Sequence, residues 1–339
     1  MGIDISDNSI KFVELKHTED GNVLSRFGRE VVPAGVIEKG NILEPEKLVQ
    51  ILKSMKQKYK LDFVRVSLPE EKVYLFQMQV PDTANEKEIR GILEFKLEEH
   101  VPISSKESIF DYEFIDESED KETIGVSVAV YPKTVIEQYA YAFRKAHITP
   151  LSFETEAQAV ERAVVRNGDR GTYMIIDFGK TRTGLSIVSN SMLALTSTIE
   201  INGQSITDVI VKHFSVSEEE ADRIKSENGL VKNEGSKEFA TAMTKVIDTL
   251  NDEIKKYVDY WHSRPNTSGK KVEKIEKIIL CGGSANIAGL PEYMLGGLKI
   301  PTEIANVWIN AFSIEDVVPE MNRFQSLAYA TAIGLALRQ

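Results

Sequence analysis

The sequence predicts an α/β protein made of two similarly ordered halves, with a small α/β subdomain inserted in the first half. Residues 2–32 and residues 173–200 each have the pattern of a strand, an Asp-containing turn and two further strands. Residues 73–141 lie between these stretches and alternate instead as strand, helix, strand, strand and helix. At 339 residues the chain is long enough to form more than one hydrophobic unit.

The first half is predicted to open with strands at residues 2–5, 10–15 and about 23–32. The first two are separated by the turn formers SDNS at residues 6–9. A helix is expected next, because apolar residues recur on one face at helical spacing: Leu48, Ile51, Leu52, Met55 and Tyr59. The sequence FVRVSL at residues 63–68 then predicts another strand.

The inserted block contains three strand-like segments, VYLFQMQV, IFDYEFI and IGVSVAVY. A helix is predicted around residues 89–97, and a second begins at Lys133. The acidic segment DESEDKE at residues 116–122 is most simply a hairpin loop. This alternation indicates a small α/β unit with a core of its own.

In the second half, YMIIDF, TGLSIV and MLALTSTIE are the expected strands, and helices follow at about residues 205–214, 218–226 and 237–261. The last of these has a long apolar stripe typical of core packing. The segment IILCGGSANIAGL at residues 278–290 predicts a short buried strand, containing Cys281, that enters a tight turn at Gly282 and Gly283. The chain is expected to end in one helix, FQSLAYATAIGLALR.

Composition narrows the class of protein. The hydrophobic content is 42% and the charged content 27%, both ordinary for a globular protein, and the net charge of -11 argues against a general nucleic-acid binder. The single cysteine, Cys281, excludes an intramolecular disulfide and fits a reducing compartment. We expect a cytoplasmic protein without direct membrane insertion, because the sequence has neither a signal-peptide pattern at its start nor an apolar run of about eighteen residues.

Three turns carry the chemistry that the sequence suggests. GIDISDNS places Asp4 beside a hairpin, IIDFGKTRT places Asp177 in the same setting, and LCGGSANIAGL supplies a glycine turn. A polyphosphate needs backbone N–H groups, short hydroxyls and a carboxylate for its metal ion. Each turn alone is compatible with a plain hairpin or helix entry, but together they predict a nucleotide site. The five histidines have no metal-ligand spacing, and no Ser-His-Asp pattern or Walker A loop is present.

These three motifs resemble the two phosphate motifs and the adenosine motif of the actin-like ATPase superfamily, and the match covers essentially the whole chain. FETEAQAVERAV and LAYATAIGLALR fall where the connecting helices of that fold lie. Within the superfamily, VPDTANEKEIRGILEFKLEEHVPISSKESIFDYEFI and PEYMLGGLKIPTEIANV are similar to the PilM family of type IV pilus assembly proteins.

The resemblance implies an actin-like (ribonuclease H-like) fold of two lobes, with the insertion in place of actin's own. Residues 1–72, 142–170 and 320–339 would form the first lobe, and residues 73–141 an inserted partner-binding subdomain. Residues 171–203 and 273–319 would form the second lobe, and residues 204–272 a helical subdomain that covers the nucleotide. The cofactors implied are ATP and Mg²⁺.

The resemblance also assigns site residues. Asp4 and Asp177 would lie near the magnesium, and Glu156 is either the residue that orients the attacking water or simply an acid at a helix N-terminus. Asp222 and Lys225 are either ribose and adenine contacts or an exposed helix pair. The remaining nucleotide contacts would be Ser6, Asn8, Ser9, Lys11, Gly179, Thr181, Thr183, Gly203, Gln204, Gly282, Gly283 and Ser284. Ser6, Gln204 and Gly184 depart from the family's usual residues, and Ser6 and Gly184 weaken the case for fast turnover more than the case for binding.

The resemblance further implies binding of the short cytoplasmic tail of PilN, an inner-membrane protein, in a groove beside the insertion, with nucleotide acting as a switch and with slow hydrolysis at most. Other pilus platform proteins and motor ATPases are further candidate partners. One alternative is a division protein of the FtsA type, which needs an amphipathic helix after its core, whereas this chain ends at Gln339 directly after the last predicted helix. The other alternative is a small-molecule kinase of the same fold, for which no additional motif is present.

Overall fold

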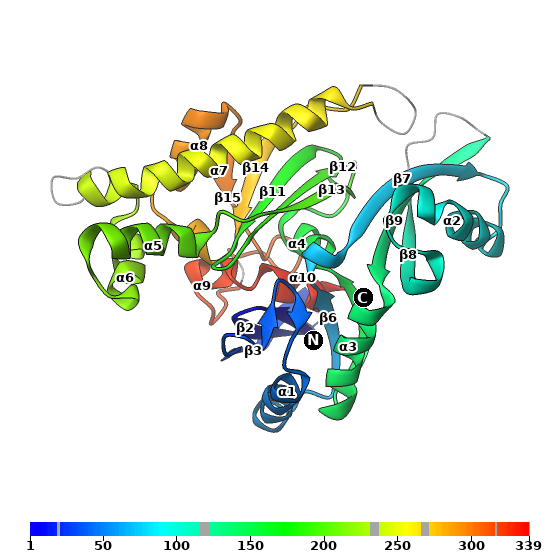
Figure 1. The fold of residues 1–339 in the computed structure, drawn as a ribbon, viewed down its shortest axis with the longest axis horizontal. Coiled ribbons are helices and arrows are strands. Elements are labelled where there is room, and N and C mark those ends of the chain that lie inside the picture. Colours follow the sequence, from blue (N-terminus) through cyan, green and yellow to red (C-terminus); the bar gives the residue numbers. More distant parts are fainter. Residues whose placement is uncertain (19–20, 116–121, 231–236, 266–270, 316, 339) are drawn as a thin grey trace.

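The computed structural model describes residues 1–18, 21–115, 122–230, 237–265, 271–315 and 317–338. The predicted acidic hairpin loop therefore lies almost entirely outside the described residues. Two five-stranded sheets, one in each lobe, organise the fold (Figure 1).

The first sheet has the order β10-β6-β1-β2-β3, with β1 (Gly2–Ser6) at its centre. β1 is antiparallel to β2 (Ser9–Thr18) and parallel to β6 (Phe63–Leu68). The outer strands are β3 (Gly21–Val31) and β10 (Thr149–Thr155). A two-stranded ribbon, β4 (Ile37–Glu38) with β5 (Asn41–Ile42), follows β3 along the chain.

The second sheet repeats this plan in the order β15-β14-β11-β12-β13. Its central strand β11 (Thr172–Phe178) is antiparallel to β12 (Thr183–Ser189) and parallel to β14 (Lys277–Cys281). β13 (Met192–Ile199) and β15 (Thr302–Ile304) form the edges. Because β1 and β11 occupy equivalent positions, the Asp-bearing ends of the two central strands are equivalent as well.

Two helices lie between the sheets and join the lobes (Figure 1). They are α4 (Glu156–Val164) and α10 (Ala330–Leu337), which pack directly against each other. A Cβ on Gly334 would lie 1.6 Å from the carbonyl oxygen of Ala159, so this close crossing requires glycine. The outer face of the first sheet is covered by α1 (Pro45–Tyr59) and α3 (Lys133–Lys145), whose apolar side chains share one core with the sheet.

The last predicted helix is wrong as a single element, because it is divided into α9 (Arg323–Leu327) and α10. The carbonyl of Leu327 accepts a hydrogen bond from the backbone N–H of Gly282, 3.0 Å away, so it is not used to continue the helix. Bonds of the i to i−3 type, from Ala328 N to Gln325 O and from Tyr329 N to Ser326 O, close α9 instead.

The insertion is a three-stranded sheet, β7-β9-β8, packed against one helix (Figure 1). Its elements are β7 (Tyr74–Pro81), α2 (Glu86–His100), β8 (Ser108–Ile115) and β9 (Thr123–Pro132). Short 3₁₀ turns, η1 (Glu70–Lys72) and η2 (Ser105–Glu107), precede β7 and β8. These strands and α2 share a small separate core, whereas α3, at the end of the predicted block, packs with α1 in the first lobe.

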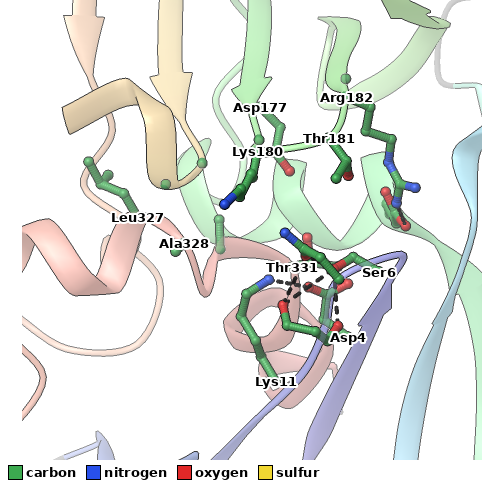
Figure 2. Close-up of a pocket in the computed structure, with 18 of the residues that line it drawn as sticks. Asp4, Ser6, Lys11, Asp177, Lys180, Thr181, Arg182, Leu327, Ala328 and Thr331 are labelled. Carbon is green, nitrogen blue, oxygen red and sulfur yellow. Dashed lines mark hydrogen bonds and ion pairs between the residues drawn. The ribbon is translucent and has the colours of Figure 1, made fainter. Parts of the chain in front are cut away.

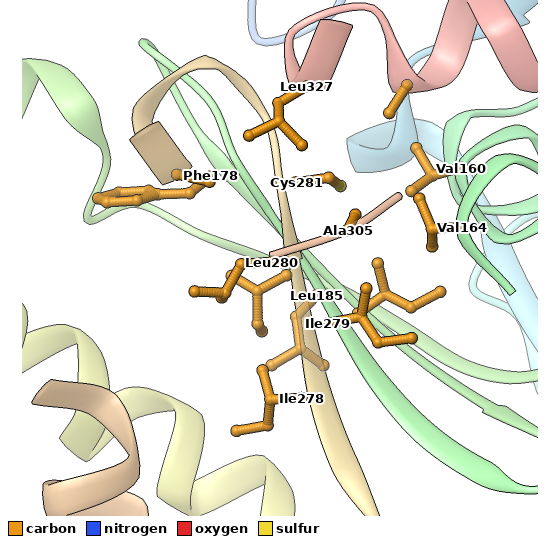
Figure 3. Close-up of a cluster of buried hydrophobic side chains, with 14 of the residues drawn as sticks. Val160, Val164, Phe178, Leu185, Ile278, Ile279, Leu280, Cys281, Ala305 and Leu327 are labelled. Carbon is orange, nitrogen blue, oxygen red and sulfur yellow. The ribbon is translucent and has the colours of Figure 1, made fainter. Parts of the chain in front are cut away.

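The second lobe carries α5 (Gly203–Phe214), α6 (Glu218–Asn228), α7 (Lys237–Ser263) and α8 (Leu290–Leu298). β14 is buried among apolar side chains of both lobes, and Figure 3 shows Cys281 within this cluster. Burial raises the pKa of the Cys281 thiol well above its usual range, as suits an inert core residue. Nowhere in the described ranges does a helix combine the length and the apolar character that a membrane crossing needs.

Candidate functional site

A cavity of about 190 Å³ lies between the lobes, where the central strands of both sheets end (Figure 2). The β1–β2 turn borders it on one side and the β11–β12 turn on the other. The glycine turn after β14 and the break between α9 and α10 complete its wall. The cavity thus gathers segments that lie as much as three hundred residues apart in the sequence.

Most of the predicted site residues line this cavity: Asp4, Ser6, Asn8, Ser9, Lys11, Glu156, Asp177, Gly179, Thr181, Gly282 and Gly283. Several other lining residues were not predicted from the sequence: Arg29, Lys180, Arg182, Leu327, Ala328, Ala330 and Thr331. Lys180 and Arg182 belong to the predicted second turn, so their basic character was the available signal. Although the net charge of the chain is -11, Lys11, Arg29, Lys180 and Arg182 together give the cavity basic side chains that suit an anionic ligand.

The cavity contains one aspartate from each lobe. Asp4 is buried, with Oδ1 accepting a hydrogen bond from Ser67 Oγ at 3.1 Å and Oδ2 paired with Lys11 Nζ at 3.0 Å. Burial raises the pKa of Asp177, Lys11 opposes this, and the neighbouring Asp4 raises it further. A cation between the two carboxylates would stabilise both in their charged form.

The donor set fits magnesium better than a metal that needs many protein ligands. No group of three or more His, Cys, Asp or Glu side chains is arranged to hold a metal in the part of the chain that the structure describes. Magnesium keeps several water ligands and is commonly held by one or two carboxylates together with phosphate oxygens. Asp4 and Asp177 provide that number.

The two glycines after β14 differ in their surroundings. Gly282 has a φ of 86°, and a Cβ there would lie 2.3 Å from Asp177 Oδ1 and 2.6 Å from the carbonyl oxygen of Phe178. A side chain is therefore excluded by sterics and by backbone conformation. A Cβ on Gly283 would meet only the Cβ of Ala328, at 3.5 Å, so this glycine presents open backbone to the cavity.

The turn between β1 and β2 is closed by its own side chains. The hydroxyl of Ser6 lies 3.0 Å from both Asn8 Oδ1 and the carbonyl oxygen of Ser9. Asp7 accepts hydrogen bonds from the backbone N–H groups of Lys39 (2.9 Å) and Gly40 (3.2 Å). The polar groups of this turn are thus fixed before any ligand arrives.

Other predicted residues surround the cavity without being among its lining residues. The N–H of Gly203 donates to the carbonyl of Gly179 at 2.9 Å, and that of Gln204 to the carbonyl of Lys180 at 2.9 Å. Ser284 Oγ donates to Gly179 O at 3.2 Å, so these contacts fix the second turn against α5 and the glycine turn. Thr183 is buried and donates to the carbonyl of Ile201 at 2.6 Å.

Asp222 and Lys225 form an ion pair of 2.7 Å, but they are more than an exposed helix pair. The side chain of Lys225 is only 12% exposed. Its Nζ also donates to Thr207 Oγ1 at 2.7 Å and to the carbonyl of Gly203 at 3.3 Å. Lys180 Nζ lies 3.5 Å from Asp222 Oδ2, which links this pair to the second turn.

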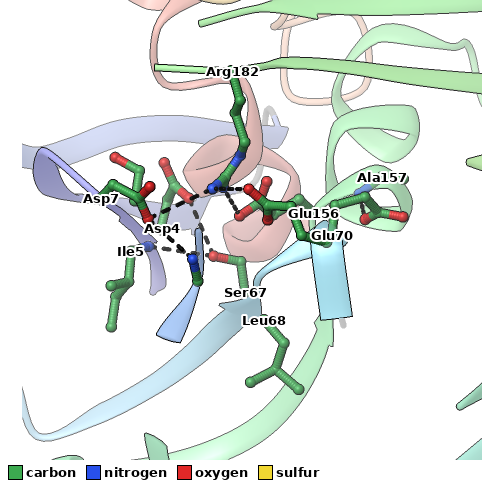
Figure 4. A network of polar contacts seen from close by, with 12 residues as sticks. Asp4, Ile5, Asp7, Ser67, Leu68, Glu70, Glu156, Ala157 and Arg182 are labelled. Atoms are coloured by element: carbon green, nitrogen blue, oxygen red, sulfur yellow. Dashed lines mark hydrogen bonds and ion pairs between the residues drawn. The ribbon is translucent and has the colours of Figure 1, made fainter. Parts of the chain in front are cut away.

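A network of acidic side chains surrounds Arg182 (Figure 4). The guanidinium donates to Glu71 Oε1 at 3.0 Å and to Glu156 Oε1, and it lies 4.0 Å from Asp7 Oδ1. Glu156 is the first residue of α4, and burial raises its pKa well above the usual range against the opposing charge of Arg182. Glu156 is thus both a helix N-terminal acid and a cavity-lining group, and its carboxylate is engaged by Arg182.

A second cavity, of about 370 Å³, lies between the insertion and the first lobe. We call it the groove. Ile109, Asp111 and Glu113 of the edge strand β8 line one side, and Glu154, Thr155 and Gln158 of the β10–α4 junction line the other. The Glu154 side chain is only 4% exposed, and its Oε2 is held by Arg162 at 2.7 Å. Its Oε1 has no hydrogen-bond partner among the residues described.

Comparison with known proteins gives the relationships of the whole chain. The sequence model for the type IV pilus assembly protein PilM matches residues 2–339. The structure is similar to that of a PilM-PilN type IV pilus biogenesis complex, with 21% identity over 99% of this chain and 97% of that chain and a TM-score of 0.78. It is also similar to the ethanolamine utilization protein EutJ from Carboxydothermus hydrogenoformans, with 13% identity, coverage of 99% and 88% and a TM-score of 0.58. MreB5 of Spiroplasma citri bound to ADP has 15% identity, coverage of 91% and 92% and a TM-score of 0.52. The predicted two-lobed actin-like fold is confirmed.

Proposed function

The chain belongs to the family of type IV pilus assembly proteins PilM, and from this premise we propose that it is an ATP-binding component of the pilus assembly platform at the inner membrane. It is cytoplasmic and reaches the membrane through a PilN-type protein, whose short N-terminal cytoplasmic segment it binds. Its role in pilus assembly would also support twitching motility. The family match over residues 2–339 favours this function over a division protein or a small-molecule kinase.

The proposal that the chain binds ATP is supported mainly by one observation, that residues of both lobes line the same cavity. Asp4 and Asp177 supply carboxylates for Mg²⁺, and the basic side chains of Lys11 and Lys180 suit phosphate oxygens. Gly283 supplies backbone that a nucleotide can approach closely. MreB5, a protein of the same fold, has been seen with ADP bound.

We propose that nucleotide acts as a conformational switch and that hydrolysis is slow at most. A residue that orients an attacking water must have a hydrogen-bonding atom within reach of that water. In the candidate, Glu156, the carboxylate oxygen Oε1 is bound to Arg182. The hydroxyl of Ser6 is likewise engaged within its own turn.

The groove suits a short peptide in an extended conformation. β8 is an edge strand, so its outer backbone groups can pair with an added strand, and apolar residues such as Ile109, which is 41% exposed, can supply side-chain pockets. Glu154 lines the groove, and its buried Oε1 has no hydrogen-bond partner among the residues described, so a peptide donor that reaches it would satisfy it. Ordering a flexible segment costs free energy, so we expect an affinity of about 1 μM.

Calorimetric titration tests this assignment, with a synthetic peptide that has the cytoplasmic sequence of the PilN-type protein from the same organism. Ile109→Glu should weaken binding at least tenfold, about 1.4 kcal/mol, because it puts a charge into the groove. Phe95→Glu is the matched control, since Phe95 is 78% exposed on α2 of the same subdomain and does not line the groove.

A variant lacking residues 74–132 extends the test to the whole insertion. α3 is kept because it packs in the core of the first lobe. Once this variant is shown to be folded and to bind ATP, it should bind no peptide. Equal peptide binding by the variant and the intact protein would refute the groove as the site.

A further inference from the structure

Arg182 belongs to the β11–β12 turn of the second lobe, yet its partners belong to the first lobe (Figure 4). Glu71 lies on the short turn η1 between β6 and β7, and Glu156 opens α4. One buried guanidinium, with a side chain 14% exposed, therefore holds two separate first-lobe segments. A buried charge pair of this kind is costly to break on one side only.

The two segments held by Arg182 also form a wall of the groove. Leu68 and Leu75 flank η1 in the sequence and line the groove. Glu154, Thr155 and Gln158 flank Glu156 and line the groove as well, whereas Glu156 itself lines the cavity between the lobes. Side chains of one short junction thus face two different cavities.

The segments are also bonded to each other. Glu70, next to Glu71, accepts a hydrogen bond from the backbone N–H of Ala157 at 3.1 Å, and Ala157 follows Glu156. Burial raises the pKa of Glu70, and the hydrogen bond from Ala157 opposes this rise. A displacement of either segment therefore affects the other segment and the groove wall that they form together.

We propose that Arg182 is a positioning residue that couples the cavity between the lobes to the groove. An anionic phosphate group entering the cavity competes with Glu71 and Glu156 for the guanidinium. When Arg182 turns toward the phosphate, the two segments lose their common partner and the groove they line changes shape. Glu156 is released into the cavity by the same movement. This inference rests on the proposed function, because it requires that the cavity take a nucleotide and the groove a peptide.

The test is the factor by which nucleotide changes peptide affinity. The probes are the non-hydrolysable analogue AMPPNP with Mg²⁺ and the peptide described above, titrated calorimetrically in each other's presence and absence. Wild type should show a change of about fivefold or more in the peptide Kd, with the same factor for the effect of peptide on AMPPNP. Arg182→Lys keeps the charge but not the fork that spans two carboxylates, so the factor should fall to within about twofold of unity while both ligands still bind.

Two further variants keep the result interpretable. Glu71→Gln removes one of the two strong contacts and leaves Arg182 in place, so it should reduce the factor even if Arg182→Lys fails to fold. Glu200→Gln is the matched control, because it breaks another contact between the lobes, the exposed pair of Lys39 and Glu200 at 2.8 Å, which includes no residue of either segment. This control should keep the wild-type factor.

The outcomes separate the two proposals. If wild type fails to bind AMPPNP or the peptide, the proposed function is wrong and the coupling falls with it. If both bind but wild type shows no coupling, or if Arg182→Lys and Glu71→Gln lower thermal stability and leave the factor unchanged, Arg182 has only a structural role and the inference is wrong.

Discussion

Among single residues, the neighbouring glycines Gly282 and Gly283 differ in the reason why each position suits glycine. Gly282 is required by the fold, because its φ is positive and a Cβ would collide with Asp177 and Phe178. Gly283 lines the cavity, and a Cβ there would meet only the Cβ of Ala328, at an ordinary contact distance of 3.5 Å. A substitution at Gly283 therefore probes the ligand rather than the fold.

Gly283→Val should lower ATP affinity at least tenfold, about 1.4 kcal/mol, because the branched side chain would occupy space next to the nucleotide. The far-ultraviolet circular dichroism spectrum and the melting temperature should stay close to wild type. Gly296→Val is the control, since a Cβ on Gly296 would have nothing within 4 Å and Gly296 is not among the residues that line the cavity. Wild-type affinity in Gly283→Val would place the nucleotide elsewhere.

At the scale of elements, the sequence predicts what depends on local pattern. The strand predicted from FVRVSL has the same first and last residues as β6. The apolar face predicted for residues 48–59 is the buried face of α1. The break between α9 and α10 was not predictable, because it depends on a hydrogen bond from Gly282 to Leu327, far away in the sequence. The packing of α3 on α1 was missed for the same reason, since an amphipathic pattern does not identify its partner.

A partly buried glutamate on α4, Glu161, should make the stability of the protein depend on pH. Burial raises the pKa of Glu161 to about 7, Arg162 opposes the shift, and Glu113 and Glu154 add to it. Because the folded state keeps this proton up to a higher pH than the unfolded state, the contribution of Glu161 to the free energy of unfolding should fall between about pH 5 and pH 7 and then level off.

Urea unfolding of wild type and Glu161→Gln across this range tests the expectation. The variant should gain stability over wild type as the pH rises, by at most about 1.4 kcal/mol per pH unit. Glu219→Gln, at an exposed position on α6, serves as the control for loss of a surface carboxylate. A constant difference between wild type and Glu161→Gln from pH 5 to pH 8 would show that Glu161 titrates alike in both states.

At the scale of the whole molecule, the repeated order of strands let the sequence predict two lobes and place an aspartate at the central strand of each. It also predicted most of the residues that line the cavity between them. It did not predict the contacts of Arg182 with Glu71 and Glu156, because these depend on how the lobes are set against each other. Contacts between side chains of different lobes can be assigned only from a structure that contains both lobes.

Thermal unfolding with and without ligand measures whether ATP binds with Mg²⁺ between the lobes, as we propose. At a hundredfold excess over its Kd, Mg²⁺-ATP should stabilise wild type by about 2.7 kcal/mol. Asp177→Ala should fold without ligand, because burial already disfavours its charged form, and should lose most of the stabilisation. Asp111→Ala, at an exposed carboxylate that lines the groove, should keep it. Removing magnesium with a chelator should have the same effect on wild type as Asp177→Ala. An equal shift in wild type and Asp177→Ala, or no shift in wild type, would contradict the assignment.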